Sequence, residues 1–190
     1  MLTNITHAEL MTTNTRDKII ELAQESIATR GYSAMSFREL AAELGIKSAS
    51  VHYYFPTKTH LGVEVARTYR GRLEEALHQI AEQYPNPKKA VKQLVAIYRH
   101  EAESSQRMTV CTMLAAEIKN LPIEIQQEMQ AFYDLNLGWI ETRLAQAGVR
   151  QSAEKARQIF ALLQGGLMGA KGQNDPAYFD VVTKAVTTLI

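Results

Sequence analysis

The sequence predicts an all-α protein of about nine helices, in which a small three-helix domain precedes a larger helical domain. Apolar residues recur at three- and four-residue steps through nearly every segment, which is the period of an amphipathic helix. The breaks between segments carry residues that end and restart helices, and no segment alternates as a strand does. These two observations define the fold class before any single helix is placed.

The first helix is predicted over residues 15–30. Ile19, Ala23 and Ile27 lie on one of its faces. Gly31 ends it, because a glycine just past the last turn adopts the left-handed conformation that closes many helices.

Two shorter helices follow. The second begins at Ser36, in a capping box where the serine side chain bonds the Glu39 amide and Glu39 reaches back, and it ends at Gly45. Ser48 is expected to cap a third, very short helix, which Pro56 cannot continue.

Six further helices are expected. They cover residues 57–83, 87–104, 109–119, 122–147, 152–171 and 175 to the C-terminus. Asn86 and Ser152 are the expected caps of two of them. The domain junction falls inside helix 57–83, because the first three helices are too small to be stable without a long helix to pack against. The predicted domains are residues 1–60, with 1–14 as a flexible arm, and 61–190.

The composition limits the class of protein. The chain has 190 residues, of which 46% are hydrophobic and 22% charged, as in a soluble globular protein of one or two domains. A single cysteine excludes an internal disulfide framework and favours a reducing compartment. No apolar run is long enough to cross a membrane, and the N-terminus does not resemble a signal peptide. We therefore expect a cytoplasmic protein with no membrane partner.

Residues 36–55 have the pattern of a helix-turn-helix. The turn contains Gly45, and Val51 and Phe55 are expected to face inward, which leaves the polar face of the second helix outward. Such a helix enters the major groove of DNA, and the start of the following helix, with Lys58, suits a phosphate. The candidate DNA contacts are Ser36, Lys47, Ser48, Ala49, Ser50, His52, Tyr53 and Lys58.

The distribution of charge favours the same interpretation. Residues 1–46 contain four basic and six acidic side chains, whereas residues 47–72 contain five basic and one acidic. Positive charge therefore gathers where phosphates would lie. The alternative is a capped helix pair in a helical adaptor that binds protein rather than DNA.

The N-terminal stretch resembles the DNA-binding domain of TetR-family transcriptional repressors. The resemblance covers residues 15–61 and rests on Gly31-Tyr32, Ser36-Phe37-Arg38-Glu39-Leu40-Ala41, Leu44-Gly45-Ile46 and Tyr54-Phe55-Pro56-Thr57-Lys58. It implies a homodimer on a palindromic DNA operator, released by a small-molecule inducer that binds the C-terminal domain. It also assigns Lys58 to the phosphate backbone and helix 48–54 to base readout. His52 stands where many members carry Tyr.

A single short recognition helix buries too little surface for strong specific binding, so a dimer is expected. The candidate interface is formed by the helices at 122–147 and 152–171. Gly165, Gly166 and Gly169 weaken the second of these helices and need a packing reason, such as close approach at an interface or pocket wall. A kink or an early end of the helix is the alternative.

An inducer pocket is expected among the fourth to eighth helices. Its candidate lining residues offer apolar and aromatic surface, although such residues at helical spacing also build cores. They are Tyr69, Tyr98, Met108, Met113, Phe132 and Trp139.

Cys111 is either a small buried hydrophobe or a sensor. It lies near Arg107 and near the start of a short helix, where amides and a cation would favour the thiolate. Residues 111–122 also resemble a TetR subgroup whose cysteine senses reactive electrophiles, and Lys171 falls where that subgroup has a lysine partner. Modification of Cys111 is therefore a second candidate trigger.

No enzyme signature is present. The histidines and carboxylates form no metal-binding pattern, and neither a phosphate-binding loop nor a nucleophile elbow occurs. We expect no catalysis, no cofactor and no metal.

Overall fold

The computed structural model describes residues 14–104 and 107–190, and within these ranges every regular element is a helix. The predicted all-α fold is confirmed. The elements are α1 (Thr15–Arg30), α2 (Phe37–Leu44), α3 (Ser48–Tyr54), α4 (Lys58–Gln83), α5 (Pro87–Ser104), α6 (Val110–Ala116), the 3₁₀-helix η2 (Ile118–Asn120), α7 (Ile123–Gln146), α8 (Ser152–Gln173), α9 (Ala177–Thr183) and α10 (Val186–Leu189). Of the expected arm at residues 1–14, only Asn14 lies within the described ranges.

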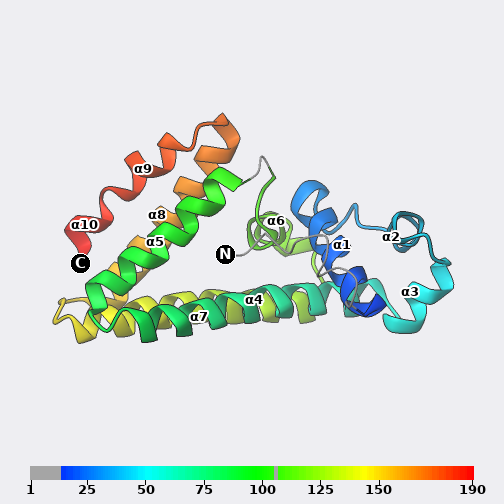
Figure 1. The fold of residues 1–190 in the computed structure, drawn as a ribbon, viewed down its shortest axis with the longest axis horizontal. Coiled ribbons are helices and arrows are strands. Elements are labelled where there is room, and N and C mark those ends of the chain that lie inside the picture. Colours follow the sequence, from blue (N-terminus) through cyan, green and yellow to red (C-terminus); the bar gives the residue numbers. More distant parts are fainter. Residues whose placement is uncertain (1–13, 105–106) are drawn as a thin grey trace.

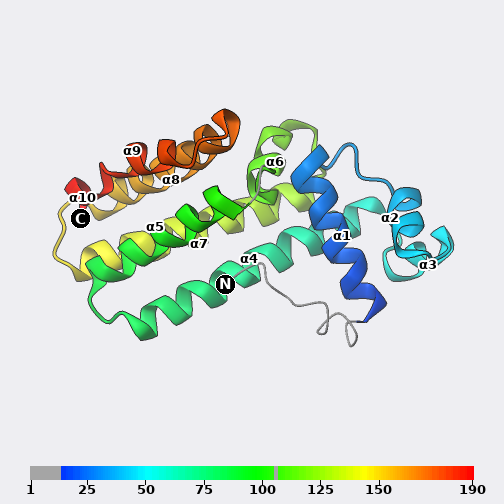
Figure 2. The ribbon, with the colours of Figure 1, turned by 45° about the horizontal axis from the view of Figure 1, so that its top comes forward.

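Two long helices organise the molecule. Helices α4 and α7 run side by side along its length, with α1, α2 and α3 gathered at one end (Figure 1). Helices α5, α8, α9 and α10 lie toward the other end, and α6 lies between the two groups, against α1 (Figure 2). The first three helices therefore lean on α4, α6 and each other, as their small size requires.

Side-chain caps explain most helix starts. Asn14, Ser36, Thr57 and Thr109 accept hydrogen bonds from the amides of Arg16, Glu39, His60 and Thr112, and Asn86 accepts one from Lys89. Each cap satisfies an amide that the helix itself leaves without a partner.

Three local predictions are wrong. Ser48 and Ser152 are the first helical residues, and Lys47 and Gln151 hold the N-cap positions without a side-chain cap. The chain enters α8 through Gln151 in the left-handed conformation, so the backbone rather than a serine sets the start. The Glu39 carboxylate pairs with Arg30 at 2.9 Å, a longer-range partner than the capping box supplies.

Two predicted helices are each divided. The segment 109–119 forms α6 and then the 3₁₀-helix η2, because the Glu117 amide is shared between the carbonyls of Met113 and Leu114. The C-terminal helix divides into α9 and α10, and between them the amides of Thr187 and Thr188 bond carbonyls three residues back.

The glycines of α8 have a packing reason within the chain. A Cβ on Gly166 would lie 3.1 Å from Phe179, and one on Gly169 would lie 2.1 Å from Tyr178, both on α9. A Cβ on Gly165 would meet nothing within 4 Å. Helix α8 continues to Gln173, so the alternative of an early end is wrong.

Candidate nucleic-acid interface and adjoining pocket

Helices α2 and α3 form the predicted helix-turn-helix. Gly45 has φ 67°, a left-handed conformation that reverses the chain at the end of α2. Ala41 is buried where the two helices pack together. Val51, on the inner face of α3, and Phe55, just after α3, are also buried. The expected inward positions are therefore confirmed, and the opposite face of α3 points outward.

The outward face of α3 carries the residues that could read DNA bases. Lys47, Ser48, Ala49 and His52 are exposed, and Ser50 is half-buried. Tyr53 is 82% exposed, which is unusual for an aromatic side chain in a monomer. Ser36 is half-buried and uses its hydroxyl as the cap of α2.

The His52 ring is held in place by a neighbour on the preceding helix. It meets Phe37 of α2 edge-on, with ring centroids 4.8 Å apart. The imidazole is therefore oriented by packing although its surface is exposed.

Lys58 lies at the start of α4, but its ammonium already has partners. The Nζ atom donates to the Ser33 carbonyl at 2.9 Å and lies 4.7 Å from the centre of the Tyr32 ring. Burial lowers the pKa of Lys58, and the Glu117 carboxylate opposes that shift. A phosphate would have to draw this ammonium away from the α1–α2 turn.

Glu117, just after α6, ties that same turn to the rest of the molecule. Its Oε2 accepts hydrogen bonds from the Ser33 amide at 2.9 Å and from the Ser33 hydroxyl at 2.5 Å. Its Oε1 would lie 2.0 Å from a Cβ on Gly31, whose φ is 86°, so only glycine fits there. Sequence reasoning missed this contact.

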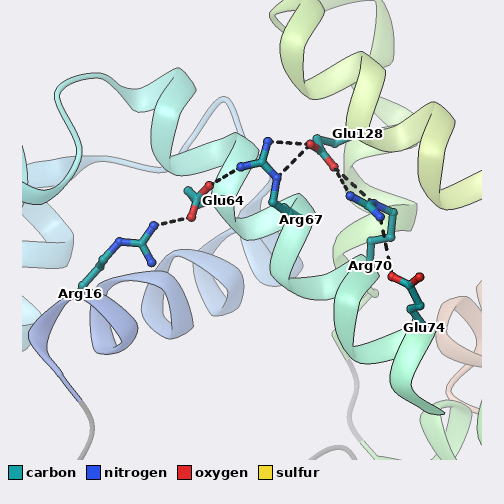
Figure 3. A network of polar contacts seen from close by, with 6 residues as sticks. All are labelled: Arg16, Glu64, Arg67, Arg70, Glu74 and Glu128. Carbon is teal, nitrogen blue, oxygen red and sulfur yellow. Dashed lines mark hydrogen bonds and ion pairs between the residues drawn. The ribbon is translucent and has the colours of Figure 1, made fainter. Parts of the chain in front are cut away.

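A chain of ion pairs joins α1, α4 and α7 (Figure 3). Arg16 of α1 pairs with Glu64 of α4, and Glu64 pairs with Arg67 at 2.7 Å. Arg67 and Arg70 both reach Glu128 of α7, at 3.0 and 3.1 Å. The Glu128 side chain is only 13% exposed, so these pairs are shielded from solvent more than ordinary surface pairs.

This network corrects the charge argument from the sequence. Two of the basic side chains counted in residues 47–72, Arg67 and Arg70, are directed at α7, and Arg72 donates to Gln24 of α1 at 3.0 Å. A count along the chain does not distinguish the faces of a long helix. Lys47 and Lys58 are the basic residues from that stretch that lie beside α3.

A pocket of about 370 Å³ lies between α1 and the long helices. Of the predicted residues, Tyr69, Tyr98, Met108 and Phe132 line it, together with Cys111. Met113 and Trp139 do not. Met113 packs near Gly31 at the end of α1, and Trp139 lies under the Arg143 guanidinium at 5.4 Å.

One wall of the pocket was not predicted. It is supplied by α1, through Glu21, Gln24, Glu25 and Ala28. Arg107 crosses the pocket edge to pair with Glu25, and Arg72 crosses it to reach Gln24. The pocket therefore includes part of the helix that supports the helix-turn-helix.

Cys111 is buried, and the expected thiolate is not favoured. Burial raises the pKa of the thiol, and hydrogen bonds from Thr109 and Tyr69 only partly oppose the shift. The Thr109 Oγ1 lies 3.1 Å from Sγ, and the thiol faces the Tyr69 hydroxyl at 4.0 Å. Arg107 is directed at Glu25 instead. Desolvation outweighs the helix amides at this position.

Lys171 is directed at α5. Its Nζ donates to the Glu101 carbonyl at 2.8 Å and lies 4.0 Å from the Glu101 carboxylate. Burial lowers the pKa of Lys171, while Glu101 raises it. Lys171 is absent from the pocket lining that contains Cys111.

Neither metal nor membrane chemistry is indicated by the described residues. They contain no cluster of three or more His, Cys, Asp or Glu side chains that could hold a metal ion. Nor does any helix in the described ranges have the length and hydropathy to cross a membrane.

A helix-turn-helix with an outward polar helix, joined to a helical domain with an internal pocket, defines a DNA-binding transcriptional regulator. Residues 19–65 match the family described as "Bacterial regulatory proteins, tetR family". Residues 19–65 therefore form a DNA-binding domain of the TetR type.

Relatives are similar along most of the chain. The HTH-type transcriptional repressor KstR2 of Mycolicibacterium smegmatis is 24% identical, over 83% of this chain and 92% of its own. A TetR transcriptional regulator from Legionella pneumophila is 28% identical, with a TM-score of 0.88 over 94% of this chain and 98% of its own. The fold is also similar to FadR from Bacillus subtilis in complex with stearoyl-CoA, at 16% identity and a TM-score of 0.73, over 92% and 98% of the two chains. These relatives are transcriptional regulators and not enzymes.

Proposed function

We propose that the protein is a cytoplasmic repressor that binds a palindromic operator as a homodimer and is released by an effector. The observation that carries this proposal is the outward polar face of α3, built over buried Val51 and Phe55, in a domain of the TetR type. Residues 1–60 form the DNA-binding domain and residues 61–190 the effector-binding and dimerisation domain.

In this proposal α3 enters the major groove and reads bases. Its polar and small residues supply the readout, while Lys58 and the start of α4 contact a phosphate. The assigned contacts are Ser36, Lys47, Ser48, Ala49, Ser50, His52, Tyr53 and Lys58.

The dimer forms through α7 and α8. Support comes from the outer face of α8, where Met168 is 50% exposed and Gly165 meets nothing within 4 Å. An exposed methionine beside an exposed glycine gives a flat apolar surface on which a second helix can approach closely.

Release starts in the pocket, either by binding of a small molecule or by modification of Cys111. Both triggers act on the same walls, because Cys111 belongs to α6 and α6 ends at Glu117, which holds the α1–α2 turn. A ligand or modification that shifts α6 or α1 changes the distance between the two α3 recognition helices of the dimer. The FadR complex supports effector binding in this fold, since that protein holds an acyl-CoA.

The DNA-binding part is tested by fluorescence anisotropy with a labelled duplex from the region upstream of the gene. We expect tight binding that weakens steeply with salt, because bound cations leave the duplex. Ser50→Ala and Tyr53→Ala are expected to change the preference among operator variants. A helical adaptor would give no binding at any salt concentration, and that result would overturn the proposal.

The second trigger is tested with N-ethylmaleimide. We expect operator release by the wild-type protein and none by Cys111→Ser. If Cys111→Ser were released as readily as the wild type, modification of this cysteine would not be a trigger.

A further inference from the structure

We propose that the pocket takes an uncharged, mostly apolar molecule of two or three rings, which contacts α1 directly and accepts a hydrogen bond from the Tyr69 hydroxyl. This inference rests on the proposed function, because it names the chemical class of the effector.

The size and walls of the pocket set the first part of this class. Its volume of about 370 Å³ lies near the lower end of the range for small-molecule sites, roughly 300 to 1,000 Å³. Most of its wall is apolar, and the wall comes from six segments of the chain. The main apolar residues are Leu73, Ile97, Met108, Val110, Phe132 and Leu167. A small apolar ligand fits such a space, which has room for two or three rings.

Four of the charged side chains of the wall already have polar partners. Arg107 pairs with Glu25, Glu101 lies 4.0 Å from the ammonium of Lys171, and Arg72 donates to Gln24. The Lys171 side chain has no exposed surface, so a charged ligand would have to disturb an ion pair in a buried setting, which is costly. An uncharged ligand leaves all three contacts in place.

Glu21 is the remaining charged residue of the lining. It is half-buried on α1, toward the surface. Its carboxylate opposes an anionic ligand, and one hydrated carboxylate at the pocket edge attracts a cation only weakly. The lining as a whole carries three carboxylates, Glu21, Glu25 and Glu101, against the guanidiniums of Arg72 and Arg107, so it offers an anion no net positive wall and favours a neutral molecule.

The Tyr69 hydroxyl supplies the polar contact. This hydroxyl lies 4.0 Å from the Cys111 sulfur, a weak acceptor at the outer limit of hydrogen-bond distance, so the phenol hydrogen can turn to a stronger acceptor in a ligand. Burial raises the pKa of Tyr69 well above its ordinary value, so the phenol stays protonated and remains a donor. The other buried phenol of the pocket, Tyr98, already donates to Asn136 at 3.2 Å. A carbonyl oxygen of the ligand is the natural partner for Tyr69.

The α1 wall gives the ligand direct access to the DNA-binding domain. Ala28 faces the pocket from α1, opposite walls from α4 and α5, and the bridges from Arg72 and Arg107 end on the same helix. A bound ligand therefore lies between the two domains and contacts α1 of the DNA-binding domain directly.

The charge preference is tested on the full-length protein by competition against the neutral fluorophore N-phenyl-1-naphthylamine. The competitors are 1-acetylnaphthalene, the anion 1-naphthoate and the cation 1-naphthylmethylammonium, which are close in shape. We expect the neutral ketone to bind at least about tenfold more tightly than either ion, in line with the cost of burying an uncompensated charge. If naphthoate or the ammonium equalled the ketone, the neutral class would be wrong.

The hydrogen bond is tested by comparing 1-acetylnaphthalene with 1-ethylnaphthalene, which has no acceptor. Tyr69→Phe is expected to remove the advantage of the ketone, and the control Tyr133→Phe, outside the pocket lining, to retain it. If Tyr69→Phe left the ketone's advantage unchanged, the assignment of this donor would be overturned.

The α1 contact is tested with Ala28→Leu, which narrows the pocket from the DNA-binding side. We expect weaker binding of every probe, whereas Ala96→Leu on the exposed face of α5 changes nothing. Helical circular dichroism confirms folding of each variant. Unchanged probe affinity in folded Ala28→Leu would overturn the α1 contact.

Operator binding is measured in parallel to separate the two proposals. Ketone binding with the expected preferences supports the ligand class even if the protein binds no operator, and that second result would overturn only the proposed function. Ketone binding that left operator affinity unchanged would overturn the effector role of this class.

Discussion

Lys58 has one set of partners in the free protein and a phosphate as its proposed partner on DNA. In the free protein its ammonium bonds the Ser33 carbonyl and lies above the Tyr32 ring. A phosphate offers a full negative charge in place of a carbonyl dipole, so its Coulomb attraction for the ammonium is stronger. The contact in the free protein therefore holds the side chain beside α3, and a phosphate bound there in the proposed complex could displace it.

We predict that Lys58→Ala weakens binding to all duplexes alike, by roughly three- to tenfold, and lowers the slope of log affinity against log salt by about one. The loss is uniform because a phosphate carries no sequence information. Anisotropy titrations across a salt series measure both quantities. Lys184→Ala, an exposed lysine beyond α9, is the matched control and should leave both unchanged. An unaltered slope in Lys58→Ala would show that this lysine contacts no phosphate.

The buried thiol of Cys111 leads to a pH prediction. Because burial raises its pKa, the thiol stays protonated to higher pH than a free cysteine, and its reactive thiolate fraction at neutral pH is smaller. We predict that iodoacetamide labels folded protein more slowly than urea-unfolded protein at neutral pH. The rate should keep rising above the pH at which the unfolded thiol levels off. Mass spectrometry measures the rates, and Cys111→Ser serves as the blank. Faster labelling of the folded protein would contradict the pKa direction.

At the scale of an element, α8 depends on glycine where α9 crosses it. We predict that Gly169→Ala lowers the free energy of unfolding by about 1 to 2 kcal/mol. The new Cβ must displace the Tyr178 ring, and the cost of this displacement exceeds the gain in helix propensity. Gly71→Ala is the matched control in the middle of α4, where a Cβ meets nothing within 4 Å. There the substitution should stabilise by up to about 1 kcal/mol. Urea denaturation measures both, and a stabilised Gly169→Ala would mean that α9 does not pack as described.

Element boundaries were predictable where the signal is local. The bounds of α1 follow from its apolar face and Gly31, and the start of α4 follows from Pro56 and the Thr57 cap, all within a few residues of the helix end. The helix-turn-helix was predictable for the same reason, and its buried positions agree with the expectation.

The missed parts of the site depend on contacts between distant segments. Glu117 and Ser33 are 84 residues apart, and no sequence pattern near either residue predicts their hydrogen bond. The α1 wall of the pocket was missed because its polar residues look like an ordinary solvated helix face. Trp139 was wrongly included for the converse reason, since an aromatic residue in a long helix does not reveal which side it faces.

For the whole molecule, the pocket, α6 and the ion-pair network form three links between the two ends. The pocket wall contains α1, Glu117 after α6 holds the α1–α2 turn, and Glu128 of α7 joins through α4 to Arg16. The reader domain is thus attached to the helices that are proposed to form the dimer. A change in the pocket can therefore alter the relation of the reader to the dimer axis, without unfolding either domain.

The assembly itself gives the last prediction. Met168→Asp places a charge on the exposed face of α8. A two-fold interface would bury two copies of this unpaired carboxylate, so we predict a monomer. Operator affinity should fall by at least about a hundredfold, because one recognition helix buries too little surface alone. Binding of N-phenyl-1-naphthylamine should persist, because Met168 does not line the pocket.

Light scattering after size exclusion measures the mass. Val181→Asp on α9, at a position 76% exposed, is the matched control and should remain dimeric if α7 and α8 form the interface. A dimeric Met168→Asp, or a monomeric Val181→Asp, would move the interface away from α7 and α8.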